Sequence, residues 1–282
     1  MNKILKLVLT FVLSIALVGC GSSGDSGKDA LELIKENGVL KIGTSPDYPP
    51  YQFYADVDGK NQIVGFEIEL AKAIAEEIGV ELEIIPSDFD GVKLNVQTKE
   101  VAMGISGFSR TPSREETFNF SNSYLQTNPE GYQGIMVRSE DVNKYQSIED
   151  IKKANLKIAA QTGSIQYELA LQLTSAENVI QLQTTDACAM QLSVGDVDAV
   201  VATDNIGRAF ANTFTNIEML GEEKFNLDPE DKFGKNGIIF PKDSSYDSLI
   251  EVVNKVIKES EDSGKLEEWR IKAEELKEAM AE

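Results

Sequence analysis

Histidine is absent from the 282-residue sequence, which excludes a Ser-His-Asp triad, histidine-ligated metal sites and imidazole general bases. Cysteine is scarce: Cys20 lies near the N-terminus, and we expect the other, Cys188, to be buried as a small hydrophobic residue. Basic residues are also few, since 27 Lys and Arg stand against 47 Asp and Glu. The net charge of −20 repels nucleic acid and anionic lipid. We interpret the acidic excess as a solvated surface.

The N-terminus indicates export from the cytoplasm. Two lysines precede an apolar run, 7–18, that is too short to span a bilayer, so residues 1–19 are predicted to be a signal peptide. The run ends in Leu17-Val18-Gly19-Cys20, which resembles the lipobox of bacterial lipoproteins and implies lipidation of Cys20. The alternative is an ordinary signal peptide with an incidental cysteine. Residues 20–28 are rich in Gly and Ser and are predicted to form a flexible, lipid-anchored linker.

One arginine stands out in the stretch 105–124. Thr111-Pro112 provides an N-cap followed by proline at the first helical position, so Arg114 is predicted in the first turn of a helix. A guanidinium beside serine hydroxyls and backbone N–H groups can bind a carboxylate through two parallel hydrogen bonds. The alternative is a surface ion pair with Glu115 or Glu116.

Hydrophobic periodicity predicts an α/β protein. Strands that alternate with helices imply right-handed βαβ units and a parallel sheet with helices on both faces. About 250 residues follow the linker, enough for two modest domains. The predicted strands are 39–43, 81–86, 101–105, 156–160, 179–182, 198–202 and 235–240, and the predicted helices are 65–79, 89–97, one from 148, 164–173, 185–195, 248–260 and 265–280.

A proline-stiffened loop follows the first predicted strand. Because prolines limit how far its aromatic rings can collapse inward, we predict a ligand-facing role for Tyr48 in this loop, with packing over the core as the alternative.

The ordered set of motifs resembles the polar amino-acid substrate-binding proteins of ABC importers, a group of family 3 extracellular solute-binding proteins. The resemblance runs from about residue 39 to 270, and each motif alone is weak. It implies a periplasmic-binding-protein-like fold with two α/β lobes, joined by two crossing strands, that close on a ligand about a hinge. The matching motifs are TSPDYPPYQF at 44–53, GFEIELA at 65–71, Asp90-Gly91 with Gln97, the stretch 106–124 and Gly163-Ser164.

The same resemblance implies the lobe boundaries. The first lobe is expected to comprise 29–127 plus 242–282, with 128–241 inserted as the second lobe. The crossings are then expected near Asn128-Pro129 and Phe240-Pro241.

Ligand contacts are carried over from the family position by position. Arg114 is expected to hold the ligand α-carboxylate, with Ser109 assisting through its hydroxyl and Gly107 through its backbone. Tyr48 and Phe89 match the two aromatic residues that sandwich the aliphatic part of the ligand. In the second lobe, N–H groups for the same carboxylate are expected from Gly163, Ser164 and Ile165.

The contacts that select the ligand are less regular. The family usually holds the ligand ammonium with an aspartate, whose position here is occupied by Thr203, with Asp204 one residue later. We favour the interpretation in which a bulge in the strand brings Asp204 inward to hold the ammonium. The alternative is that Asp204 faces outward and the ammonium is held differently. Ser45 and Gln161 are neutral where the family contacts the ligand side chain, and this suggests an uncharged ligand.

These features predict a lipid-anchored, monomeric extracytoplasmic receptor, without cofactor, metal or enzymatic activity. It is expected to bind a free L-amino acid and deliver it to an ABC permease and its ATPase. One alternative is an enzyme resembling cyclohexadienyl dehydratase, with Glu67 as a candidate acid. A sensor input domain is a third alternative, which the lipobox disfavours.

Overall fold

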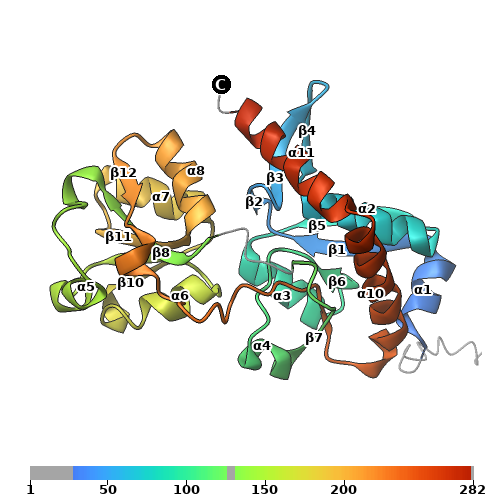
Figure 1. Ribbon diagram of the computed structural model, residues 1–282. Coiled ribbons are helices and arrows are strands. Elements are labelled where there is room, and N and C mark those ends of the chain that lie inside the picture. Colours follow the sequence, from blue (N-terminus) through green and yellow to red (C-terminus); the bar gives the residue numbers. More distant parts are fainter. Residues whose placement is uncertain (1–27, 126–130, 281–282) are drawn as a thin grey trace, which may run out of the picture.

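The computed structural model describes residues 28–125 and 131–280. It forms two α/β lobes, each built on a five-stranded sheet with its own hydrophobic core. Both ends of the described chain belong to one lobe and the middle belongs to the other (Figure 1). The two-lobed α/β fold is therefore confirmed. The predicted signal peptide, Cys20 and the crossing at Asn128-Pro129 lie outside the described residues.

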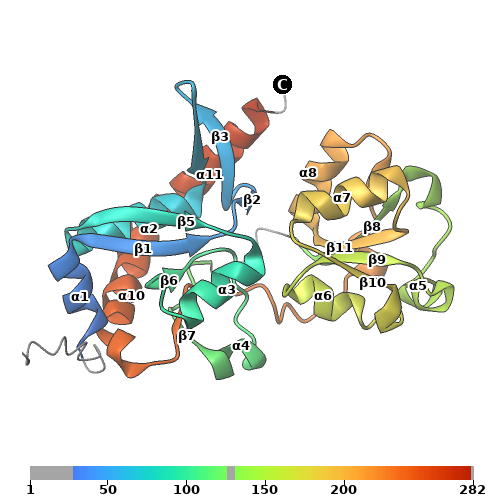
Figure 2. The ribbon, with the colours of Figure 1, turned by 180° about the vertical axis from the view of Figure 1, so that it is seen from behind.

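The first lobe has the strand order β5-β1-β6-β13-β7. One face of this sheet packs on helices from both ends of the chain, and the other face packs on α3 (Figure 2). Its strands are β1 (Val39–Thr44), β5 (Glu81–Pro86), β6 (Met103–Gly104), β7 (Phe118–Phe120) and β13 (Ile239–Pro241), and its helices are α1 (Ala30–Asn37), α2 (Phe66–Ile78), α3 (Phe89–Gln97), α4 (Pro112–Thr117), α10 (Asp247–Asp262) and α11 (Lys265–Ala279), with a 3₁₀ turn at Ser244–Tyr246.

The second lobe has the strand order β10-β9-β11-β8-β12 and two cores, one on each face of the sheet. Helices α5, α6 and α9 cover one face, and α7 and α8 cover the other. Cys188 of α7 is buried as predicted. The elements are β8 (Gln133–Arg138), β9 (Ile158–Gln161), β10 (Val179–Leu182), β11 (Ala199–Thr203), β12 (Ile217–Met219), α5 (Ile148–Ala154), α6 (Ile165–Ala170), α7 (Thr185–Val194), α8 (Asp204–Thr213) and α9 (Glu222–Phe225), with 3₁₀ turns at Ser139–Asp141 and Ala176–Asn178.

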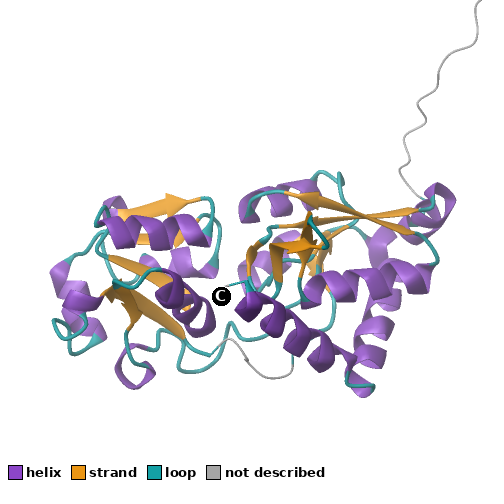
Figure 3. Cartoon of the chain, turned by 90° about the horizontal axis from the view of Figure 1, so that it is seen from above, coloured by secondary structure: helices purple, strands orange, loops and turns teal. Residues whose placement is uncertain are grey.

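A small antiparallel sheet projects from the first lobe and was not predicted. It consists of β2 (Asp47–Tyr48), β3 (Gln52–Val57) and β4 (Lys60–Val64), in that order. Asp58-Gly59 forms the tight turn between β3 and β4, and this dipeptide is a hairpin signal that the sequence contained. The sheet holds β2 on the side of the first lobe that faces the second lobe (Figures 1 and 2), and Figure 3 shows the two lobes side by side from above.

The sheets are mixed, which corrects the expectation of a parallel sheet. Strands β1, β5 and β6 are parallel in the first lobe, and β9, β10 and β11 in the second. In contrast, β13 is antiparallel to β6, and β8 is antiparallel to β11. In each lobe, the carboxyl ends of the parallel strands face the other lobe. A segment that arrives from the other lobe starts at that edge and runs away from it, so it is antiparallel to those strands.

The returning chain enters the first lobe earlier than expected. The N–H of Arg110 donates to the carbonyl of Lys235, and the N–H of Gly237 donates to the carbonyl of Phe108. Since these contacts precede β13, the crossing expected at Phe240-Pro241 lies before Lys235.

Most predicted helices begin and end where local signals place them. Asp88 and Ser147 accept hydrogen bonds at the N-termini of α3 and α5, and Gly79 ends α2 in the left-handed conformation. The helix expected over 164–173 ends sooner, at Ala170. Within 28–125 and 131–280, every helix is too short or too polar to cross a membrane.

Gly65 provides a test of how β3 is held against α2. Its φ is +131°, and a Cβ there would lie 2.0 Å from the carbonyl oxygen of Tyr51. We expect Gly65→Ala to lower the free energy of unfolding by about 3 kcal/mol or more, through backbone strain and overpacking. Gly59→Ala is the control, because Gly59 also has positive φ but has no neighbour within 4 Å of a Cβ. Equal shifts of the two urea midpoints would contradict this packing.

Candidate ligand-binding site

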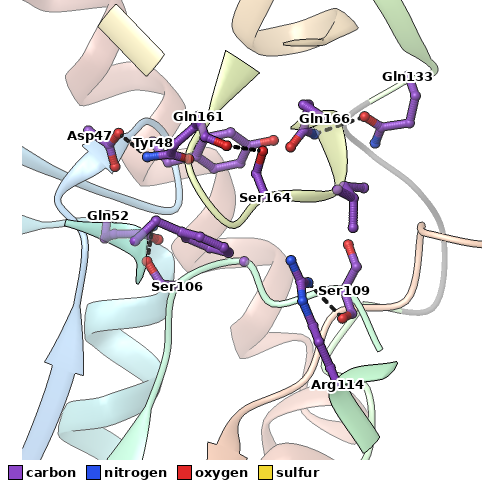
Figure 4. A pocket seen from close by; sticks show the side chains of 13 residues that line it. Asp47, Tyr48, Gln52, Ser106, Ser109, Arg114, Gln133, Gln161, Ser164 and Gln166 are labelled. Atoms are coloured by element: carbon purple, nitrogen blue, oxygen red, sulfur yellow. Dashed lines mark hydrogen bonds between the residues drawn. The ribbon is translucent and has the colours of Figure 1, made fainter. Parts of the chain in front are cut away.

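A cavity lies between the two lobes, at the carboxyl ends of the parallel strands, with about 410 Å³ of space that includes its opening to solvent. Open α/β sheets bind ligands in this position. Figure 4 shows polar side chains from both lobes that point into it. The lining residues are Asp47, Tyr48, Gln52, Phe89, Ser106, Gly107, Ser109, Arg114, Gln133, Gln161, Ser164, Ile165 and Gln166.

Arg114 occupies the predicted helix start. Thr111 caps α4, with Pro112 in its first turn, and the N–H of Arg114 donates to the Thr111 hydroxyl at 3.3 Å. Arg114 is 8% exposed, and its guanidinium donates to the carbonyl oxygens of Ser109 at 2.9 Å and Gly163 at 3.3 Å. These contacts place Arg114 at the floor of the cavity, between the lobes.

The charge of Arg114 is not neutralised by an ion pair. Its guanidinium forms no salt bridge with any Asp or Glu in the described part of the chain. Burial lowers the pKa of Arg114 to about 10, and the more distant Glu168 opposes this shift. Since this pKa is still well above 7, the site holds a buried positive charge that an anion can stabilise.

Two of the predicted aromatic residues line the same cavity. Phe89 is the first residue of α3. The centroid of its ring lies 4.7 Å from the ring centroid of Phe108 and 5.5 Å from the guanidinium carbon of Arg114. Tyr48 lies on β2 with its ring 5.2 Å from that of Tyr51. Phe89 thus packs against the cation, while Tyr48 forms another part of the wall.

The turn before α6 presents a carbonyl oxygen to Arg114, whereas N–H groups were expected there. The Gly163 carbonyl accepts hydrogen bonds from Arg114 and, at 3.1 Å, from Lys93. The Ser164 hydroxyl caps α6 by accepting from the N–H of Tyr167 and also donates to the carbonyl of Gln161. Ser164 and Ile165 line the cavity, whereas Gly163 lies against Arg114 without lining it.

Asp204 does not face the cavity. Strand β11 pairs with β8 one residue to one residue through Thr203, so it contains no bulge to turn Asp204 inward. Asp204 instead begins α8, where its carboxylate pairs with Arg208 one helical turn later at 2.9 Å. The preferred sequence interpretation of Asp204 is therefore not supported by this geometry. The Thr203 hydroxyl bonds to the Tyr48 hydroxyl at 2.7 Å.

Asp47 is the main lining residue that the sequence prediction missed. It lies in the proline-stiffened loop, where only the aromatic residues were considered. Its carboxylate accepts hydrogen bonds from the Ser45 hydroxyl at 2.7 Å, from Gln161 Nε2 at 2.8 Å and from the N–H of Thr185 at 3.1 Å. Of the two residues predicted to contact the ligand side chain, Gln161 lines this cavity and Ser45 does not. Both donate hydrogen bonds to Asp47.

Burial raises the pKa of Asp47, with a further contribution from the charge of Asp186. The hydrogen bonds from Ser45 and Thr185 oppose the increase because they favour the ionised carboxylate. Gln52, Ser106, Gln133 and Gln166 were also missed, since they have no local sequence signal and meet only through the tertiary fold.

The two lobes contact each other through β2. Besides the bonds of the Asp47 carboxylate, the Thr185 hydroxyl donates to the Asp47 carbonyl at 2.9 Å, and Tyr48 reaches Thr203. Asp47 and Tyr48 of the first lobe therefore contact β9, α7 and β11 of the second lobe.

Comparison with known proteins agrees with this architecture. The family described as bacterial extracellular solute-binding proteins, family 3, matches residues 40–272. The chain belongs to this family. The resemblance carried by the sequence motifs is thereby confirmed, and the protein is an extracellular solute-binding protein by family.

Individual relatives extend over nearly the whole chain. The arginine-binding extracellular protein ArtP of Bacillus subtilis (strain 168) is 30% identical over 279 residues, covering 96% of this chain and 98% of that protein. A crystal structure of the amino acid ABC transporter substrate-binding protein AbpA from Streptococcus pneumoniae Canada MDR_19A, bound to L-arginine, is similar with a TM-score of 0.75 at 33% identity, covering 87% of this chain and 98% of that one. The ancestral amino acid-binding protein AncCDT-1, a precursor of cyclohexadienyl dehydratase, has a TM-score of 0.72 at 26% identity and covers 86% of this chain and 98% of its own.

The hydrogen bond between Tyr48 and Thr203 can be measured with a double-mutant cycle. We expect Tyr48→Phe and Thr203→Val each to lower the free energy of unfolding, with a coupling of about 0.5–1.5 kcal/mol, because each removes one hydroxyl of the pair. Urea unfolding of the single and double variants provides the measurement. Tyr54→Phe is the control, since Tyr54 belongs to the same small sheet but is exposed. Strict additivity would show that the lobes do not meet through this pair.

Proposed function

We propose that this solute-binding protein captures an L-amino acid between its lobes and delivers it to an ABC importer. The observation that carries the proposal is the buried guanidinium of Arg114, which forms no ion pair with the described residues and is fixed at the floor of an interlobe cavity. A ligand α-carboxylate supplies the missing negative charge and two acceptor oxygens. Relatives named as amino-acid-binding proteins support this assignment.

Other ligand contacts in the proposal come from both lobes. The Ser109 hydroxyl assists Arg114, while Tyr48 and Phe89 flank the aliphatic part of the ligand. Gly107 lines the cavity, but its N–H donates to Glu67, so the backbone donor expected there is already engaged. Ser164 and Ile165 approach from the second lobe. A ligand held by both lobes has more contacts when they are together, and this difference favours the closed state.

The ligand side chain is proposed to be cationic, and arginine is the favoured ligand. Asp47 places a carboxylate in the same cavity as Arg114, so the two ends of the site carry opposite charge. Relatives that are named as arginine-binding, or whose structures contain L-arginine, point the same way. The uncharged ligand suggested by Ser45 and Gln161 is therefore not favoured, because both residues hydrogen-bond to Asp47.

The cellular setting is proposed from the sequence. Lipidation of Cys20 would tether a monomer to the outer face of the cell membrane, beside the permease and ATPase that receive the ligand. The lobe division is also a proposal, with its second boundary moved from 241/242 to before Lys235, so that residues 235–282 join 29–127 in the first lobe.

Binding is favoured over catalysis. Glu67, the candidate acid of the enzymatic alternative, does not line the cavity. It is buried behind the cavity wall, where its carboxylate accepts hydrogen bonds from the N–H of Gly107 and the hydroxyl of Tyr124. Its position supports the loop that carries Gly107 and does not offer a proton to a bound molecule.

Removal of Arg114 tests the proposed function. Arginine at a hundred times its dissociation constant should stabilise the wild type by about 2.7 kcal/mol, seen as a higher melting temperature. Arg114→Ala should weaken binding by more than about a hundredfold, because two hydrogen bonds between charged groups are lost. Arg110→Ala is the control, since Arg110 is exposed and pairs with Glu115. Equal affinity of Arg114→Ala and wild type would refute the site, and no thermal shift with any of the twenty amino acids would refute the function.

The raised pKa of Asp47 predicts how affinity depends on pH. A cationic side chain binds the ionised carboxylate, so below the raised pKa of Asp47 binding must displace a proton. Arginine affinity should then fall by up to about tenfold per pH unit as the pH is lowered through this pKa, and should level off above it.

Isothermal titration between neutral and mildly acidic pH measures this dependence. Asp47→Asn should bind arginine more weakly at neutral pH and should lose most of the pH dependence. An unchanged pH profile in Asp47→Asn would exclude Asp47 as the acceptor of the ligand cation.

A further inference from the structure

Gln52 is a buried amide in the wall of the ligand cavity. It is the first residue of β3 and pairs with Tyr48 of β2, the residue that follows Asp47 in the chain. Only 1% of its surface is exposed, yet it lines the same cavity as Asp47 and Ser106. Figure 4 shows Gln52 and Asp47 at the same end of the cavity, away from Arg114.

One half of this amide is fixed by the protein. Gln52 Nε2 donates to the Ser106 hydroxyl oxygen at 3.0 Å, and the same oxygen accepts from the N–H of Ser45 at 3.0 Å. The side chain is therefore held between β3 and the loop that follows β6.

The other half accepts no hydrogen bond from the residues that the structure describes. Gln52 Oε1 is fully buried and has no hydrogen-bond partner in the described part of the chain. A buried carbonyl oxygen without a partner is costly, and such groups in native proteins call for an explanation. Because this oxygen belongs to a residue that lines the cavity, a donor on a bound molecule provides one.

We propose that Gln52 Oε1 is a second acceptor for the ligand side chain and determines specificity together with Asp47. Asp47 supplies the negative charge, and Gln52 supplies a neutral acceptor on the same small sheet. A guanidinium matches this pair because it is planar and carries N–H groups on several sides. The proposal rests on the proposed amino-acid site, since Arg114 must hold the other end of the ligand.

A comparison of two ligands separates this role from a structural one. L-Norvaline has the three-carbon side chain of arginine without the guanidinium, so it reports the Arg114 end of the site alone. Gln52→Met keeps the length of the side chain and removes its carbonyl. Arginine affinity should fall about ten- to a hundredfold in this variant, while norvaline affinity stays within about twofold.

Gln62→Met is the matched control, because Gln62 lies on β4 of the same sheet but is exposed. It should leave both affinities unchanged. An equal loss for arginine and norvaline in Gln52→Met would indicate a structural role and overturn the proposal, as would an unchanged preference for arginine.

Gln52→Glu provides a second variant that retains the shape and an acceptor oxygen. It should keep or increase the preference for arginine over norvaline, and loss of that preference would mean that Gln52 does not act as an acceptor. If the wild type binds amino acids without preferring arginine to norvaline, this inference fails and the carboxylate site stands. If the wild type binds no amino acid, the proposed function itself fails.

Discussion

The site depends on burying the charge of Arg114 without a protein carboxylate to neutralise it. Such a charge is costly to remove from water, and its two fixed hydrogen bonds go to neutral carbonyl oxygens. One of those oxygens belongs to Gly163 of the second lobe. This hydrogen bond of Arg114 therefore requires the two lobes to be in contact. A carboxylate ligand would compensate the charge at the place where the lobes meet, and this links ligand binding to closure.

Asp47 has the complementary role at the other end of the cavity. Its carboxylate is held by Ser45 from its own lobe and by Gln161 and Thr185 from the second lobe. The group proposed to recognise the ligand cation is thus also a group through which the lobes contact each other. A cationic side chain would compete for the same oxygens, and this competition would couple the identity of the ligand to the closure of the lobes.

The strand directions explain why these groups meet. Parallel strands in both lobes end at the gap, so the residues that follow them converge there: Asp47 after β1, Gly107 after β6 and the turn with Gly163 after β9. The antiparallel strands β8 and β13 belong to segments that come from the opposite lobe. Gln133, at the start of β8, enters the cavity wall for that reason.

Sequence alone determined the features that depend on local signals and on the order of motifs. Thr111-Pro112 placed Arg114 at a helix start through capping geometry, the glycine at position 79 ended α2, and the motif order predicted the two-lobed fold and the family. Several of the predicted site residues, among them Ser109, Phe89 and Ser164, line the same cavity as Arg114. Only the tertiary structure showed that Asp204 turns toward Arg208, that Gly163 presents its carbonyl, and that Asp47 and Gln52 share the other end of the cavity. These outcomes depend on strand register, on a small hairpin sheet and on contacts between residues far apart in the chain, and no local pattern of residues specifies them.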